Sequence, residues 1–126
     1  DIPWELLWDG SWVAEFPNLQ FADYTKANAV QRPKPTVDYK LTRSVWKGSH
    51  SPADIAALLA DGERVSMILD DPSAIVHPNA VQADKTDEWL LSNDGILGML
   101  APKGKLIGDV ENYFTTSEAL DALALI

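Results

Sequence analysis

Two aspartates and a histidine are the side chains in this sequence best suited to chemistry. Asp70 and Asp71 follow a predicted strand over 64–69, and His77 comes six residues after Asp71. Ligands of open α/β sheets usually lie at the carboxyl ends of the strands. Two carboxylates and an imidazole there could hold Mg²⁺ or Ca²⁺, or act as an acid–base pair. Because Asp-Asp-Pro is also a common way to end a strand, a purely structural role fits these residues equally well.

A second candidate site lies around His50. Ser49, His50 and Ser51 precede a predicted helix whose first residue is Pro52. The free amides at a helix start attract anions, so these three side chains could help to hold a phosphate or a carboxylate. The sequence has neither a phosphate-binding loop nor a glycine-rich dinucleotide motif. Ser51 is also explained as an ordinary N-cap, without any ligand.

A complete catalytic constellation is not visible. The chain has two histidines and no cysteine, which excludes disulfides, thiolate catalysis and cysteine-ligated zinc. A triad of nucleophile, base and orienting acid is difficult to assemble from so few candidates. We therefore do not expect an enzyme. The alternative is a small metal-dependent hydrolase or phosphoryl-transfer enzyme that uses Asp70, Asp71 and His77.

The segment Trp4 to Trp12, WELLWDGSW, holds three of the five tryptophans. Pro3 suits a first helical position and Asp9-Gly10 interrupts a helix, so we expect a short turn over 3–8 and extended backbone over 11–16. A hairpin that turns at Asp9-Gly10 is the alternative. In neither arrangement do Trp4, Trp8 and Trp12 form one flat platform. We expect them to pack against the body of the protein or against a partner.

The distribution of charge is more informative than the net charge of −9. Residues 1–50 carry six acids and six bases, whereas residues 51–126 carry thirteen acids and four bases. An acidic body repels phosphate backbones, so direct nucleic-acid binding is not expected. No apolar run approaches the roughly 20 residues that cross a bilayer, so we do not expect a membrane protein.

The sequence divides into two parts. Residues 1–36 form an aromatic-rich, irregular arm whose exit, 31–36, contains two prolines. Residues 37–126 predict a single α/β or α+β domain, with a small mixed sheet of about four strands and helices packed against it. The predicted strands are 37–46, 64–69, 96–101 and 105–110, the last two joined as an antiparallel hairpin through Pro102-Lys-Gly104. The predicted helices follow Ser51, Thr86 and Thr115.

This order, β-α-β-α-β-β-α, is similar to that of thioredoxin-like domains over residues 37–126. In that family a Cys-x-x-Cys motif stands at the start of the first helix, where this chain has His50-Ser-Pro-Ala53. The resemblance therefore implies a fold without the thiol redox chemistry of the family.

The leading hypothesis from the sequence is an acidic, soluble interaction or accessory module. It would dock to a protein partner, or to a second copy of itself, through the aromatic arm, with Trp4, Trp8, Trp12 and Trp46 as candidate contacts. An anion- or nucleotide-binding domain at the helix start near His50 is a further alternative. We expect no cofactor, with Mg²⁺ or Ca²⁺ as the alternative, and a cytoplasmic rather than a secreted protein. Because the chain begins with Asp1, we expect a processed product or a fragment.

Overall fold

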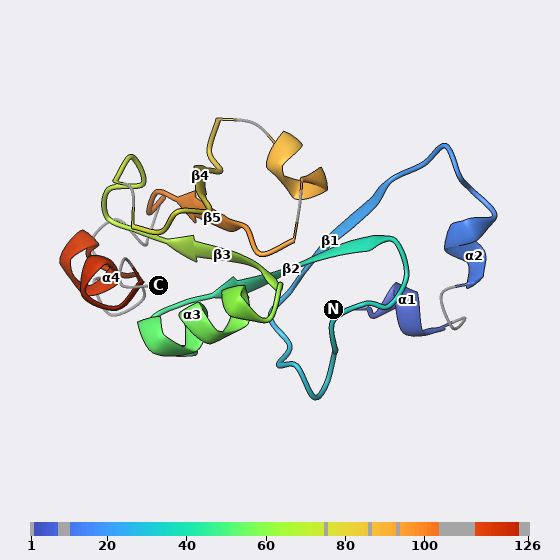
Figure 1. Ribbon diagram of the computed structural model, residues 1–126, viewed down its shortest axis with the longest axis horizontal. Coiled ribbons are helices and arrows are strands. Elements are labelled where there is room, and N and C mark those ends of the chain that lie inside the picture. The colour runs from blue at the N-terminus through green and yellow to red at the C-terminus, as the bar shows by residue number, and fades with distance from the viewer. Residues whose placement is uncertain are drawn as a thin grey trace.

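The computed structural model describes residues 2–7, 11–74, 76–85, 87–92, 94–103 and 113–123. It is an α/β arrangement in which a five-stranded parallel sheet carries a few short helices (Figure 1). The strands are β1 (Phe21–Thr25), β2 (Tyr39–Val45), β3 (Arg64–Ile68), β4 (Ala80–Gln82) and β5 (Leu97–Leu100). The helices are α1 (Trp4–Leu7), α2 (Ser11–Ala14), α3 (Pro52–Ala60), the 3₁₀ helix η1 (Glu88–Leu91) and α4 (Thr116–Leu123).

The strand order in the sheet is β1-β2-β3-β5-β4, and every described pairing is parallel. The expected mixed sheet of about four strands is therefore replaced by a parallel sheet of five. The thioredoxin-like order is not confirmed, because β1 and β4 were not among the predicted strands. The second strand of the predicted hairpin, 105–110, lies outside the described residues.

The two unpredicted strands have weak sequence signals for a physical reason. β1 lies within the segment expected to be an irregular arm, yet Phe21 pairs with Tyr39 and Thr25 with Arg43. β4 has only three residues, too few to show an alternation of apolar and polar side chains. Both strands are stabilised by the neighbours they pair with, which a local pattern does not reveal.

The helix predicted after Ser51 is confirmed. The Ser51 hydroxyl accepts the amide of Asp54, and the Asp54 carboxylate accepts the amide of Ser51, so both partners of a capping box are present. Pro52 occupies the first turn, where its missing amide costs nothing. The helix stops before Gly62, whose φ of +78° is readily adopted only by glycine.

One face of the sheet forms the main core with α3 and α4. Alternate residues of β2, β3 and β5 point to this face, and α3 and α4 supply the opposing apolar side chains. The cluster consists of Val45, Ile55, Ala56, Leu59, Val65, Met67, Leu69, Val76, Leu97, Met99, Phe114 and Ala119. This core orients β2, β3 and β5, and their carboxyl ends meet at one edge.

The opposite face carries small and polar side chains and is only partly covered. The 3₁₀ helix η1 lies over its amino-terminal half, because the Arg64 guanidinium donates to the carbonyl oxygens of Trp89 and Ser92. The indole of Trp89 then rests on Gly98, where a β-carbon would lie 2.5, 2.6 and 2.8 Å from three ring atoms. Glycine is therefore required at this position for η1 to reach the sheet.

We predict that Gly98→Ala destabilises the protein by about 1–3 kcal/mol, because the added methyl group must displace the Trp89 ring. Chemical denaturation followed by circular dichroism measures the change. Gly48→Ala is the matched control, since its β-carbon would meet only the movable Trp46 side chain, at 3.3 Å. Equal effects of the two substitutions would contradict the packing described for Trp89.

Candidate functional site

The N-terminal segment folds as two single helical turns rather than as a hairpin. α1 covers Trp4–Leu7, as the short turn after Pro3 predicts. The extended backbone expected over 11–16 is wrong, because Ser11–Ala14 is helical. The packing of Trp12 and Val13 accounts for the helical turn. In α2, both side chains reach the aromatic side chains at the edge of the sheet.

Trp12 packs on the aromatic side chains of β1 and β2. Its ring lies edge-on to Phe21, with 4.8 Å between centroids, and edge-on to Tyr39 at 6.2 Å. Val13, Tyr39 and Leu41 are the buried residues of a second, smaller core, and Trp12 and Phe21 pack against it. Edge-to-face contacts of this kind add to the free energy gained by burying the rings. The Trp12 side chain therefore belongs mainly to the protein interior.

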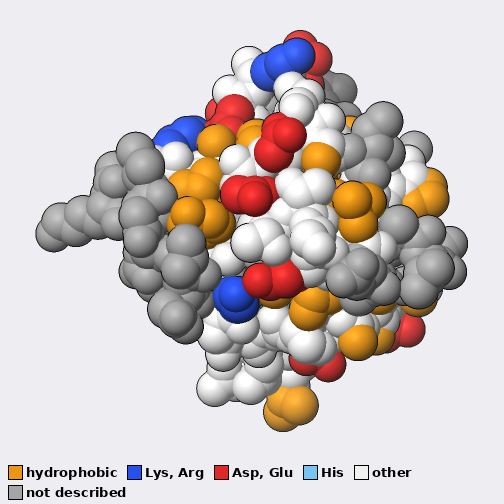
Figure 2. Space-filling view, turned by 90° about the vertical axis from the view of Figure 1, so that its left-hand side faces the viewer, with side chains coloured by type: hydrophobic (Ala, Val, Ile, Leu, Met, Phe, Trp, Pro, Cys, Tyr) orange, Lys and Arg blue, Asp and Glu red, His pale blue; other side chains and the backbone are white. Residues whose placement is uncertain are grey.

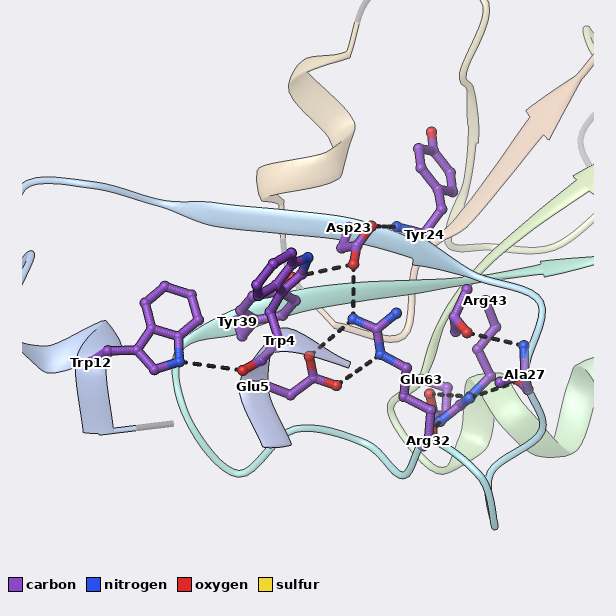
Figure 3. A network of polar contacts seen from close by, with 11 residues as sticks. Trp4, Glu5, Trp12, Asp23, Tyr24, Ala27, Arg32, Tyr39, Arg43 and Glu63 are labelled. Atoms are coloured by element: carbon purple, nitrogen blue, oxygen red, sulfur yellow. Dashed lines mark hydrogen bonds and ion pairs between the residues drawn. The ribbon is translucent and has the colours of Figure 1, made fainter. Parts of the chain in front are cut away.

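A buried ion-pair network connects the N-terminal segment to the sheet (Figure 3). The Arg32 guanidinium donates to both carboxylate oxygens of Glu5, at 2.8 and 2.9 Å, and to Asp23 of β1 at 2.8 Å. Arg32 is 1% exposed and Glu5 is 3% exposed. The hydroxyl of Tyr39 donates to the same Asp23 oxygen at 3.2 Å. One guanidinium thus joins α1, β1 and the connection between β1 and β2.

A second arginine satisfies the backbone of that connection. Residues 26–38 join β1 to β2 without a helix, so their carbonyl groups need donors from elsewhere. The Arg43 guanidinium donates to the carbonyl oxygens of Ala27 and Arg32, at 3.2 and 2.6 Å. Glu63 neutralises Arg43 through two further contacts at 3.0 and 3.3 Å. The two arginines therefore take the place of a packed crossover helix.

The network shifts the pKa values of Arg32 and Tyr39. Hydrogen bonding to Glu5, and then to Asp23, raises the pKa of Arg32 against the opposing effect of burial. Burial and, to a smaller extent, the charge of Asp23 raise the pKa of Tyr39 to about 12. Arg32 therefore stays cationic and Tyr39 stays neutral across the physiological range.

Apolar side chains are nevertheless exposed along the same segment. Trp4 is 41% exposed and Leu19 is 56% exposed. The exposed large apolar side chains of residues 2–19 are Ile2, Trp4, Leu6, Phe16 and Leu19. Figure 1 shows α1 and α2 at the amino-terminal end of the sheet, away from α4. We call these five side chains the arm surface.

The four candidate tryptophans have different surroundings. Trp4 contributes to the arm surface, and its carbonyl oxygen accepts the Trp12 indole at 3.3 Å. Trp46 is half-buried and lies elsewhere, at the carboxyl end of β2, with the Lys26 ammonium 5.9 Å from its ring centroid. Trp8 lies outside the described residues. The structure thus does not bring Trp4, Trp12 and Trp46 together on one surface.

The predicted anion-binding side chains make local hydrogen bonds. The Ser49 hydroxyl donates to the Trp46 carbonyl at 2.9 Å, accepts the Trp46 amide at 3.0 Å, and lies 2.8 Å from Nδ1 of His50. Ser51 caps α3, as described above. These contacts explain the three residues as a turn that leads into a helix.

Asp70, Asp71 and His77 are likewise engaged in structural roles. The Asp70 carboxylate accepts the amide and hydroxyl of Thr116, at 2.8 and 2.6 Å, which anchors the start of α4. Asp71 accepts the amide and hydroxyl of Ser73 within its own turn. His77 is buried, its Nδ1 accepts the Asn79 amide at 3.0 Å, and burial lowers its pKa. Across the described residues, no group of three or more histidine, aspartate or glutamate side chains is placed to hold a metal ion.

No helix within the described part of the chain is long and apolar enough to cross a membrane. No protein-family model matches the sequence, and neither the curated proteins nor the solved structures include a match. Function must therefore be argued from the chain itself.

Sequence reasoning missed the Glu5–Arg32–Asp23 contact. The one available signal was the balance of six acids and six bases in residues 1–50, beside a strong acidic excess in the rest. Equal numbers of acids and bases allow pairing within the segment, but they do not say which residues pair.

We predict that Glu5→Gln destabilises the protein by about 2–4 kcal/mol, because it removes a carboxylate that neutralises the buried Arg32 charge. It should also release the N-terminal segment and increase quenching of tryptophan fluorescence by iodide. Urea denaturation and quenching titrations measure the two effects. Glu15→Gln, an exposed acid in the same segment, is the control and should change stability by less than about 0.5 kcal/mol. Equal behaviour of the two variants would contradict the role given to Glu5.

Proposed function

We propose that this protein is an interaction module that docks to a protein partner through the arm surface. The observation that carries the proposal is that exposed apolar side chains are concentrated near the amino terminus. Of the nine exposed large apolar side chains among the described residues, five belong to residues 2–19. Tryptophan and phenylalanine on such a surface are typical anchors of protein interfaces.

The way the segment is held supports this role. The buried Glu5–Arg32 pair and the packing of Trp12 fix the backbone of α1 and α2 before any partner arrives. A surface that is ordered in advance loses less conformational entropy on binding. Glu5 is buried and paired with Arg32, so its carboxylate is not presented beside the exposed Trp4 and Leu6.

The enzymatic and anion-binding alternatives have less support. Asp70 and Asp71 hold turns and the start of α4, and His77 is buried against its own loop. Around His50, each described hydroxyl has a partner within the turn. The contacts described above for both groups explain these side chains without a ligand.

The test is a pull-down from native extract with the triple variant Leu6→Glu, Phe16→Glu and Leu19→Glu as bait. Burying each apolar side chain contributes on the order of 1 kcal/mol, so three charges should weaken partner binding by well over tenfold. Quantitative mass spectrometry compares the proteins retained by the variant with those retained by the unmodified chain. The variant should lose a defined set of proteins while keeping its melting temperature.

The matched control replaces exposed apolar residues elsewhere, with Val30→Glu, Leu91→Glu and Leu120→Glu. This variant adds the same charge and should retain the partner fully. Sedimentation velocity of the unmodified chain reveals whether the partner is a second copy. If both triple variants retain the same proteins and the same sedimentation behaviour as the unmodified chain, the proposal is wrong.

A further inference from the structure

A cavity of about 380 Å³ lies at the other end of the sheet, on the face that η1 leaves uncovered. Its size falls within the range of small-molecule sites, about 300–1,000 Å³. The lining side chains that give the cavity its polar and apolar parts are Lys26, Ser44, Trp46, Ser66, Ile68 and Leu100. They come from the carboxyl ends of β2, β3 and β5 and from the residue that follows β1. This is the edge at which parallel sheets commonly bind ligands.

The cavity exists because small side chains occupy the middle of the sheet. Ser44 pairs with Ser66, and Ser66 pairs with Gly98, so one row across three strands has almost no side-chain volume. Trp89 fills the space above Gly98 but does not line the cavity. The space above the two serines, toward Trp46 and Leu100, is thus left for another molecule.

The polar side chains among the described residues that line the cavity can donate hydrogen bonds. The Ser66 hydroxyl, in a residue only 3% exposed, lies 3.3 Å from the Ser44 hydroxyl. A bond between two hydroxyls uses only one of their two protons, so the pair can still donate to a ligand. Lys26 follows the Thr25–Arg43 pair, which places it beside Ser44, and its ammonium lies over the Trp46 ring.

The charged side chains near the cavity determine whether an anionic or a cationic ligand is favoured. No carboxylate is among the described residues that line it, although residues 51–126 carry thirteen acids and four bases. Figure 2 shows this end of the molecule, where acidic side chains lie between apolar ones. Lys26 can therefore attract one negative charge, whereas the acidic excess of the chain as a whole disfavours a polyanion such as a nucleotide.

We propose that this cavity binds a small amphipathic monoanion, a carboxylate with a compact apolar or aromatic body. The carboxylate would accept hydrogen bonds from Lys26 and the Ser44–Ser66 pair. The apolar body would lie against Trp46, Ile68 and Leu100. The site is separate from the arm surface, so binding here does not depend on the docking function.

The experiment is a titration of the ¹⁵N-labelled protein with benzoate, followed by two-dimensional NMR. Benzoate should shift the amides of 44–46 and 66–68 saturably, with an affinity at least tenfold higher than that of neutral benzamide. Lys26→Met should weaken benzoate binding about tenfold and leave benzamide unchanged. Lys85→Met, which removes an exposed lysine that does not line the cavity, is the control and should bind benzoate normally.

A second variant tests the cavity itself. Valine is favoured in β-strands, so Ser66→Val should leave the protein folded, with a dispersed NMR spectrum. Its methyl groups would fill the space above the row of small residues and should abolish saturable binding. Equal binding of benzoate and benzamide, or saturable shifts centred on 49–51 instead, would overturn the proposal. Unchanged benzoate affinity in both Lys26→Met and Ser66→Val would also overturn it.

Discussion

The structure depends on a buried guanidinium that three elements share. Arg32 pairs with Glu5 of α1 and Asp23 of β1, while its own carbonyl oxygen accepts Arg43. A charge so deeply buried is costly unless every contact is made, and breaking such a pair is far more damaging than losing a surface one. The pair therefore defines one position for the N-terminal segment and one course for the connection between β1 and β2.

The consequence is a molecule with different features at its two ends. Parallel strands place all their carboxyl ends at one edge, where the small residues Ser44 and Ser66 leave a cavity. At the opposite end the ion-pair network holds two short helical turns that could not persist alone, since isolated helices of this length are unstable in water. Their apolar side chains remain exposed because the interior beneath them is already filled by Trp12, Val13 and Tyr39.

The sequence predicted the local features and missed the long-range ones. The N-cap at Ser51, the helix that follows it and the strand predicted over 64–69 are encoded within a few residues, and each is found in the structure. β4 has only three residues, and β1 (Phe-Ala-Asp-Tyr-Thr) shows neither an apolar run nor a regular alternation, so no local pattern indicated them.

The candidate sites were also difficult to judge from the sequence, because their partners are distant or in the backbone. Asp70 and Ser49 are residue types that often bind ligands. In the structure they hold Thr116 and the Trp46 backbone, which gives them structural roles. The Glu5–Arg32 pair joins residues 27 positions apart and could not be read from spacing.

The most direct test of this account is a double-mutant cycle on Glu5→Gln and Arg32→Met, with the free energy of unfolding measured by urea denaturation. If the buried pair holds the segment in place, the two substitutions are strongly non-additive, with a coupling of about 2 kcal/mol or more. The double variant should then be little less stable than either single one. A coupling below about 0.5 kcal/mol, the size found for exposed pairs, would contradict the central claim.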